Sequence, residues 1–338
     1  MGGVPTPAPE SDGETAVVIG SRAIAGLRAG FLALLATQNG GCARFPDPAP
    51  VQAHPRIVSL NPCSDAVLAE VADRGQIAAI SAYSQDPRAS SMDLGVARSF
   101  PATGGTAEEV VALRPDVVIA GSFLPPDSRS AFARLGLRVE PLGIADDVPA
   151  SLAQVRRIAA LAGHPERGEA LVRRIEGALA RAAPPAGAAP IPAVLWEEGG
   201  MVPGGATLVS DLMRRTGFAN MTAAQGMKQA DRLPLEAMLA DPPRVILAAG
   251  DPRAEGDRLL RHPALAGLKG TMRARFEPTL TLCGGPTIVR AVERLAEVRA
   301  ALKPLPLAGG VWGGQRLSAT SRLTSPPPTP PASGRGVS

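Results

Sequence analysis

The chain has 338 residues, with 35 Lys and Arg against 31 Asp and Glu, a net charge of +4, and 45% of its residues are hydrophobic. This length allows two compact lobes, and the composition is that of a globular protein. Nucleic-acid binding is not expected, because the sequence contains no run of five basic residues and has only two Trp and one Tyr to stack on bases.

The first part of the chain is typical of an export signal. Two arginines precede the apolar run Ala29–Ala36, which is too short to span a bilayer. Cys42 follows at the place where a bacterial lipoprotein is lipidated, but Asn39 stands where such a signal prefers an apolar residue. Cleavage after Val51-Gln52-Ala53 is the alternative, so the sequence leaves a lipid-anchored form and a free exported form open.

Short apolar runs then alternate with longer helical patterns, which predicts an α/β fold with mostly parallel sheets. A long helical segment in the middle is interrupted at Gly163-His164-Pro165, a typical stop-and-start signal. The predicted strands are Arg56–Leu60, Gln76–Ile80, Asp116–Ala120, Ala193–Trp196 and Arg244–Ala248.

An internal repeat supports two similar lobes. The segment from Glu108 through Pro115 to Ala120 is echoed by the segment from Glu236 through Pro243 to Ala248, at the same spacing of residues. Both read as a short helix, a proline and a strand. We therefore predict an N-terminal extension with the export signal (1–53), an N-terminal lobe (54–145), a linking helical segment (146–183), a C-terminal lobe (184–303) and a disordered Pro/Gly-rich tail (304–338).

Five segments, in order, resemble the periplasmic binding proteins of ABC importers for ferric siderophores, haem and cobalamin. These segments are Arg56–Pro62, Ile80–Ser84, Gly104–Gly121, Gly204–Asn220 and Cys283–Leu295. The resemblance implies two Rossmann-like lobes joined by one long helix, with the ligand cleft between them. It also implies a monomeric, periplasmic solute-binding protein that has no cofactor of its own and delivers a metal chelate to a homodimeric permease in the inner membrane.

In that family one exposed Glu on each lobe docks on the permease. By position these map to Glu108 and Glu236, with Glu109 as a substitute for Glu108. Equivalent carboxylates on equivalent lobes suit a two-fold symmetric partner. The alternative is an ordinary helix-start Glu, which the helix dipole favours.

Ligands of α/β lobes lie at the carboxyl ends of strands, so the loops there supply the expected contacts. For Tyr83 and Trp196 the alternative is a half-buried packing residue. The expected ligand-binding residues are Asn61, Cys63, Tyr83, Ser84, Phe100, Phe123, Trp196, Met201, Cys283 and Gly284. Among them Tyr83 and Trp196 are the leading candidates, because an amphipathic ring at a strand end can form the wall of a chelate site.

The cysteines and histidines limit which kinds of site are expected. Cys63 and Cys283 are ligand contacts, a disulfide or inert thiols, and sequence does not choose among these. His54, His164 and His262 look scattered, so no metal site is expected and the ligand must bring its own chelator.

Two other classes of function remain. A cysteine-dependent enzyme would use Cys63 near a helix start, but no base is placed beside it, so no catalytic residue is assigned. A surface-tethered interaction module with a degenerate cleft would bind no small molecule.

The identity of the ligand stays open. Four arginines suit an acidic ferric siderophore, and four aromatics suit a corrinoid; with aromatics at only 3% an iron chelate is slightly favoured. These sets are Arg88, Arg98, Arg273 and Arg275, and Tyr83, Phe100, Phe123 and Trp196.

Overall fold

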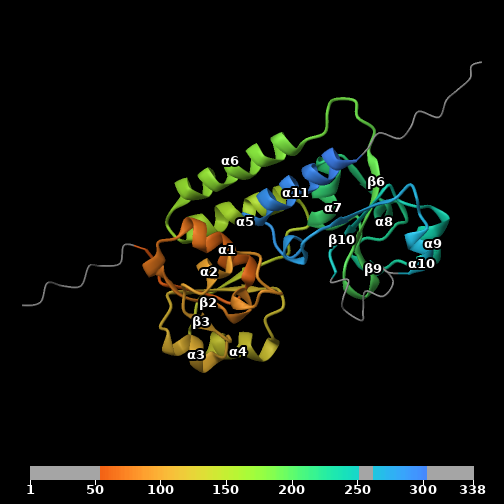
Figure 1. The fold of residues 1–338 in the computed structure, drawn as a ribbon. Coiled ribbons are helices and arrows are strands. Elements are labelled where there is room, and N and C mark those ends of the chain that lie inside the picture. The colour runs from red at the N-terminus through yellow and green to blue at the C-terminus, as the bar shows by residue number, and fades with distance from the viewer. Residues whose placement is uncertain (1–53, 251–261, 303–338) are drawn as a thin grey trace, which may run out of the picture. The chain divides into compact units, whose positions relative to one another are not determined.

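The computed structural model describes residues 54–250 and 262–302 (Figure 1). The predicted export signal, Cys42 and the Pro/Gly-rich tail lie outside the described residues. Among the described helices none is long and apolar enough to cross a membrane.

The first half of the described chain forms a five-stranded sheet in the order β3-β2-β1-β4-β5, in which every pair of neighbours is parallel. The predicted strands at 56–60, 76–80 and 116–120 are present. In chain order the elements are β1 (Ile57–Ser59), α1 (Pro62–Val71), β2 (Ile77–Ser81), α2 (Leu94–Ala97), β3 (Ala102–Thr103), α3 (Ala107–Ala112), β4 (Val117–Gly121), α4 (Pro126–Arg134) and β5 (Val139–Leu142), with 3-10 turns at Arg74–Gln76 and Ala82–Gln85.

Two helices, α5 (Val148–Leu161) and α6 (Pro165–Ala182), follow this sheet and pack against each other (Figure 1). The interruption predicted at Gly163-His164-Pro165 is present, and the linking segment that the resemblance described as one long helix consists of these two helices. The reason lies in the predicted break: Gly163 adopts a φ of +81°, which favours glycine, and Pro165 can only begin a helix here. Asp147 caps α5 by accepting a hydrogen bond from the Ala150 N–H.

The second half forms a four-stranded parallel sheet in the order β11-β10-β6-β8, and β7 and β9 form a separate antiparallel pair. The predicted strands at 193–196 and 244–248 are present. The elements are β6 (Ile191–Trp196), β7 (Met201–Pro203), α7 (Leu208–Arg215), β8 (Phe218–Asn220), α8 (Met221–Ala224), β9 (Ala230–Arg232), α9 (Leu235–Ala240), β10 (Val245–Ala248), α10 (Pro263–Ala266), β11 (Met272–Arg275) and α11 (Thr287–Ala301), with 3-10 turns at Glu198–Gly200 and Pro278–Leu280.

The internal repeat occupies equivalent places in the two sheets. Ala107 and Leu235 begin α3 and α9, and Val117 and Val245 begin β4 and β10; both pairs of residues are 128 positions apart. In each half the strand after the repeated helix pairs in parallel with the first strand, as β4 with β1 and β10 with β6. The largely parallel α/β fold predicted from the sequence is confirmed.

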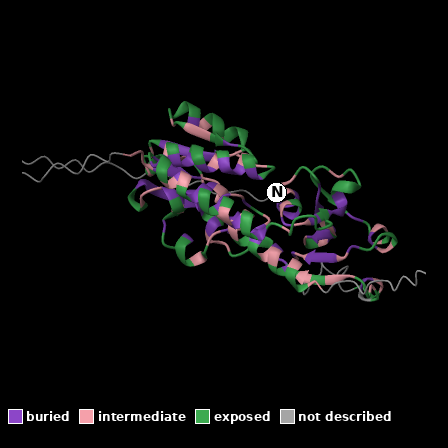
Figure 2. Ribbon diagram, turned by 90° about the horizontal axis from the view of Figure 1, so that it is seen from above, coloured by how far each residue is buried: buried purple, intermediate pink, exposed green. Residues whose placement is uncertain are grey.

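Alternating side chains of the central strands divide the core into three clusters of buried residues. Figure 2 colours each residue of the ribbon by how far it is buried. Ile57 of β1 and Leu195 of β6 belong to one large buried cluster that also includes residues of α1, α5, α6, α7 and α11. Val58, which follows Ile57, and Val194, which precedes Leu195, lie on the opposite faces of their sheets. They belong to two smaller outer clusters. Because one cluster of buried residues runs through both halves, the helices between them are held firmly against each lobe.

Candidate functional site

A pocket of about 330 Å³ lies between the two halves, at the carboxyl ends of their parallel strands. The loops after β1, β4 and β5 form one side, and the loop after β6, the start of α7 and the segment before α11 form the other. This is where ligands of open α/β sheets bind. The lining residues are Asn61, Cys63, Ser122, Phe123, Leu142, Gly143, Ile144, Ala145, Asp146, Gln154, Glu197, Pro203, Thr207, Leu208, Val209, Gln229, Ala230, Thr281, Leu282, Cys283 and Gly284.

Half of the expected contacts line this pocket, namely Asn61, Cys63, Phe123, Cys283 and Gly284. Phe123 is 85% exposed and offers an open apolar surface. Asn61 has a structural task as well, because its side-chain oxygen accepts the hydrogen bond of the Cys63 N–H and caps α1. Gly284 is needed for close packing, since a Cβ at this position would lie 2.2 Å from Ser151 Oγ.

Trp196 does not line this pocket. It is the last residue of β6, and the alternation along that strand directs it to the outer cluster with Val194, where it is 0% exposed. The next residue, Glu197, takes the position on the pocket. The sequence correctly located the strand end but could not show which face of the sheet each side chain meets.

The other expected contacts also lie away from the pocket lining. Tyr83 sits on the 3-10 turn after β2 with 68% of its surface exposed, and Ser84 is buried with its hydroxyl donating to Asp65. Phe100 is a core residue with the Arg74 guanidinium 4.7 Å from its ring centroid. Met201 begins β7, whose partner is β9.

The described pocket lining contains carboxylates but no Lys, Arg or His. Burial raises the pKa of Glu197 above its ordinary value, and a hydrogen bond with Thr281 offsets part of this effect. Asp146 is the second acid. The lining also contains amide and hydroxyl side chains that were not expected from the sequence, because no local motif marks them: Ser122, Gln154, Thr207, Gln229 and Thr281.

Cys63 and Cys283 form a disulfide, with their Cα atoms 5.1 Å apart. The bond joins the first turn of α1 to the segment before α11, and both halves of the cystine line the pocket. Of the readings that the sequence left open, the structure selects the disulfide. Cys63 therefore has no thiolate, which removes the nucleophile that a cysteine-dependent enzyme needs.

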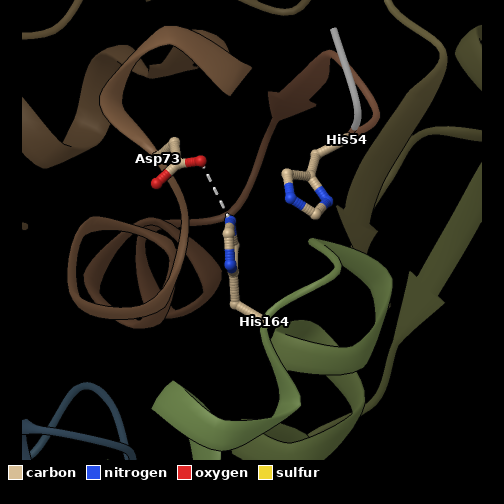
Figure 3. A group of neighbouring side chains, drawn as sticks. All are labelled: His54, Asp73 and His164. Carbon is tan, nitrogen blue, oxygen red and sulfur yellow. Dashed lines mark ion pairs between the residues drawn. The ribbon is translucent and has the colours of Figure 1, made fainter.

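Two of the histidines that looked scattered lie together. The ring centroids of His54 and His164 are 4.4 Å apart, and Asp73 Oδ2 is 3.2 Å from His164 Nε2 (Figure 3). The three residues come from the segment before β1, the end of α1 and the α5–α6 turn. Their separation in sequence hid this arrangement, which corrects the expectation that the histidines form no cluster.

The two repeat glutamates are both exposed in the first turns of α3 and α9. Glu109, the substitute considered for Glu108, is engaged in its own loop: its carboxylate accepts hydrogen bonds from Thr103 Oγ1 at 2.6 Å and from the Gly104 N–H at 2.7 Å. These bonds hold the pKa of Glu109 below its ordinary value. Of the two neighbouring glutamates, Glu109 is thus the one whose carboxylate is held in local hydrogen bonds.

Comparison with solved structures gives the same architecture. A periplasmic haem-binding protein from Pseudomonas aeruginosa has a TM-score of 0.58 at 24% identity, with 75% of this chain and 95% of that chain covered. The vitamin B12-binding protein BtuF of Vibrio cholerae has a TM-score of 0.56 at 16% identity, with 72% and 96% covered. The haem-binding protein HutB of Vibrio cholerae has a TM-score of 0.58 at 18% identity, with 72% and 98% covered.

No curated protein matches the sequence. A family model described as periplasmic binding protein matches residues 57–273, which include both parallel sheets up to the first residues of β11. Such proteins bind and carry solutes and are not enzymes, and the ligand that they hold is cargo rather than a cofactor. Together with the two-lobed fold and the interlobe pocket, this match shows that the chain belongs to the periplasmic binding protein family.

Proposed function

We propose that the protein captures an uncharged, amide-bearing metal chelate of the corrinoid class in the interlobe pocket and delivers it to an ABC permease. The observation that supports this ligand class is the charge of the pocket. Its described lining has the acids Asp146 and Glu197 and no basic side chain. Sequence composition slightly favoured an iron chelate, and the four arginines suggested for an acidic siderophore are absent from this lining.

Electrostatics separates the candidate ligands. Haem carries two propionates, and catecholate ferric siderophores carry several negative charges, so both would place anions beside the acids of the pocket. Like charges brought together in a desolvated site cost several kcal/mol. The periphery of a corrinoid carries amides instead, and side chains such as Asn61, Gln154 and Gln229 can both donate to and accept from an amide.

Metal coordination points the same way. Haem iron is bound in proteins by His, Tyr, Met or a Cys thiolate. None of the first three lines the described pocket, and Cys63 is held in the disulfide with Cys283. A corrinoid supplies the equatorial ligands of its own cobalt and needs no axial ligand from the protein.

The test is a binding panel measured by calorimetry and by co-elution of the coloured ligand with the protein. We expect one cyanocobalamin per chain, with haemin and a catecholate ferric siderophore at least about 100-fold weaker, a difference of about 2.7 kcal/mol. Equal or tighter binding of either anion would refute the ligand class while keeping a chelate-binding function. Absence of binding across the whole panel would refute the proposed function itself.

Glu197 offers a matched pair of variants for the same panel. Glu197→Lys should narrow the preference for cyanocobalamin over haemin at least about tenfold, because it replaces an acid on the pocket by a base. Glu198→Lys makes the same change one residue further on, at an exposed position outside the lining. It should leave the preference unchanged, and equal effects of the two variants would show that net charge rather than the pocket is responsible.

Delivery is proposed to use Glu108 and Glu236 as docking acids. They occupy repeat-related positions and are both exposed, so each can meet the same site on one of two identical permease subunits. Glu108→Arg and Glu236→Arg should each lower the rate of ligand uptake by cells at least about tenfold, since a charge reversal places like charges across the contact.

Ligand affinity of the purified docking variants should stay within about twofold of the unaltered protein, because neither acid lines the pocket. Glu176→Arg on the exposed side of α6 is the control and should leave uptake unchanged. Normal uptake by both docking variants would exclude these residues from the permease contact.

A further inference from the structure

The cluster of His54, Asp73 and His164 brings three metal-ligating side chains together outside the ligand pocket. One donor atom of each lies within 4.8 Å of the others. They come from three separate places in the chain, so the site exists only in the folded protein. Two imidazoles and a carboxylate form a donor set suited to borderline divalent transition-metal ions.

His164 is the fixed centre of this cluster. Its side chain is 8% exposed, and its Nε2 lies 3.2 Å from Asp73 Oδ2 and 3.0 Å from Gln76 Oε1. Nε2 of His164 therefore faces two oxygen atoms. Metal–ligand bonds of about 2.0 to 2.1 Å in tetrahedral geometry place ligand atoms about 3.3 Å apart, so an ion bound by Nε2 and Asp73 Oδ2 needs little change in the spacing of these two atoms.

His54 is brought to the same place by the α5–α6 turn. Its ring stands 4.4 Å from the ring of His164, centroid to centroid. Gly163 leaves the necessary space, because a Cβ at that position would lie 2.3 Å from Nδ1 of His54. Figure 3 shows the His54 imidazole beside the His164 imidazole, with Asp73 reaching Nε2 from the opposite side.

Neighbouring side chains hold the three metal-ligating side chains in position. Glu166 Oε1 lies 3.7 Å from Nδ1, the other ring nitrogen of His164, which is longer than a hydrogen bond; a small shift of this exposed side chain would bring it to the carboxylate–histidine contact that usually supports a metal-bound imidazole. Arg167 bonds Asp73 Oδ1 at 2.8 Å, which leaves Oδ2 for an ion. Gln76 is held in place because its amide donates to the carbonyl of Ala162 at 2.9 Å.

We propose that His54, Asp73 and His164 bind a divalent transition-metal ion such as Zn²⁺, with the Gln76 oxygen or water completing the coordination. The ion would tie the segment before β1 and the end of α1 to the α5–α6 turn, and thus fasten the connecting helices to the first lobe. This site is distinct from the chelate pocket, and its metal would be resident rather than cargo.

The experiment uses the full chain without an affinity tag, stripped with a chelator and dialysed against ZnSO₄. We expect one Zn²⁺ per chain with a dissociation constant in the micromolar range or below, and a rise of several degrees in the thermal midpoint when Zn²⁺ is present. Co²⁺ in the same site should give the intense visible absorption of low-coordinate cobalt bound by nitrogen.

His54→Ala and Asp73→Asn should each weaken Zn²⁺ binding at least about tenfold and abolish the thermal shift. His262→Ala, at the start of α10, removes the one remaining histidine and should change neither. Circular dichroism confirms that each variant is folded, and cyanocobalamin binding by the variants separates this site from the pocket. Sub-stoichiometric Zn²⁺ in the unaltered protein, or unchanged binding in both ligand variants, would overturn the proposal.

Discussion

Reduction of the Cys63–Cys283 bond is expected to destabilise the protein by roughly 3 to 5 kcal/mol and to lower its thermal midpoint by about 10 °C. The two cysteines are 220 positions apart, so the bond restricts a long segment of the unfolded chain, and long loops give the larger effects. The measurement is thermal unfolding of the oxidised protein with and without a phosphine reductant, together with a count of reactive thiols under denaturing conditions.

Three variants control this prediction. Cys63→Ala, Cys283→Ala and the double variant should all unfold near the midpoint of the reduced protein, and the reductant should not shift them further. More free thiols per oxidised chain than the one that Cys42 supplies, or a midpoint that the variants share with the oxidised protein, would show that the two residues are not bonded in solution.

The same bond bears on ligand binding. Cys63 lies in the first turn of α1, and Cys283 stands two residues before Gly285, whose N–H donates to Ser151 of α5 at 2.8 Å. The disulfide thus joins two walls of the pocket, one carried by α1 and the other bonded to α5. Both helices contribute residues to the large buried cluster that the two halves share. Reduction should therefore weaken chelate binding as well as stability, because the two walls of the pocket would no longer be bonded to each other.

The repeat explains why the fold could be predicted and parts of the site could not. Pro115 and Pro243 mark a helix–strand unit whose local signals are strong, so both β4 and β10 were located correctly. A strand end alone does not say which sheet face the last side chain meets. Trp196 was therefore assigned to the pocket although it packs with Met238 and Leu265 in the outer cluster.

Contacts between residues far apart in the sequence could not be predicted from the sequence, for a different reason. His54 and His164 are separated by more than a hundred residues, and only the α5–α6 turn brings them together. Cys63 and Cys283 raise the same problem, but there the arithmetic of two remaining cysteines kept the pairing among the options. A site built from residues far apart in the chain can therefore be recognised only from the folded structure.

The second large expected effect concerns the pH dependence of stability, and it arises from Asp65 of α1. The residue is 0% exposed, and burial raises the pKa of its carboxyl to about 7. Hydrogen bonds from the Ser84 hydroxyl and the Ser81 N–H oppose this rise but do not cancel it. Below about pH 4 the carboxyl is protonated in both states and adds no pH dependence. Between about pH 4 and 7 the unfolded chain releases a proton that the folded protein retains, so stability falls as pH rises and levels off above pH 7.

Asp65→Asn should therefore stabilise the protein at pH 8 by up to about 4 kcal/mol, the equivalent of about three pKa units, and have little effect near pH 4. The amide keeps the shape of the carboxyl and still accepts the hydrogen bonds from Ser81 and Ser84. Denaturant unfolding at pH 4.5, 6 and 8 measures the difference, and Asp127→Asn on the exposed start of α4 should change stability by less than about 0.5 kcal/mol throughout. An effect of Asp65→Asn that is the same at all three pH values would mean that the buried carboxyl does not change its protonation on folding, because only a shifted titration makes the difference grow with pH.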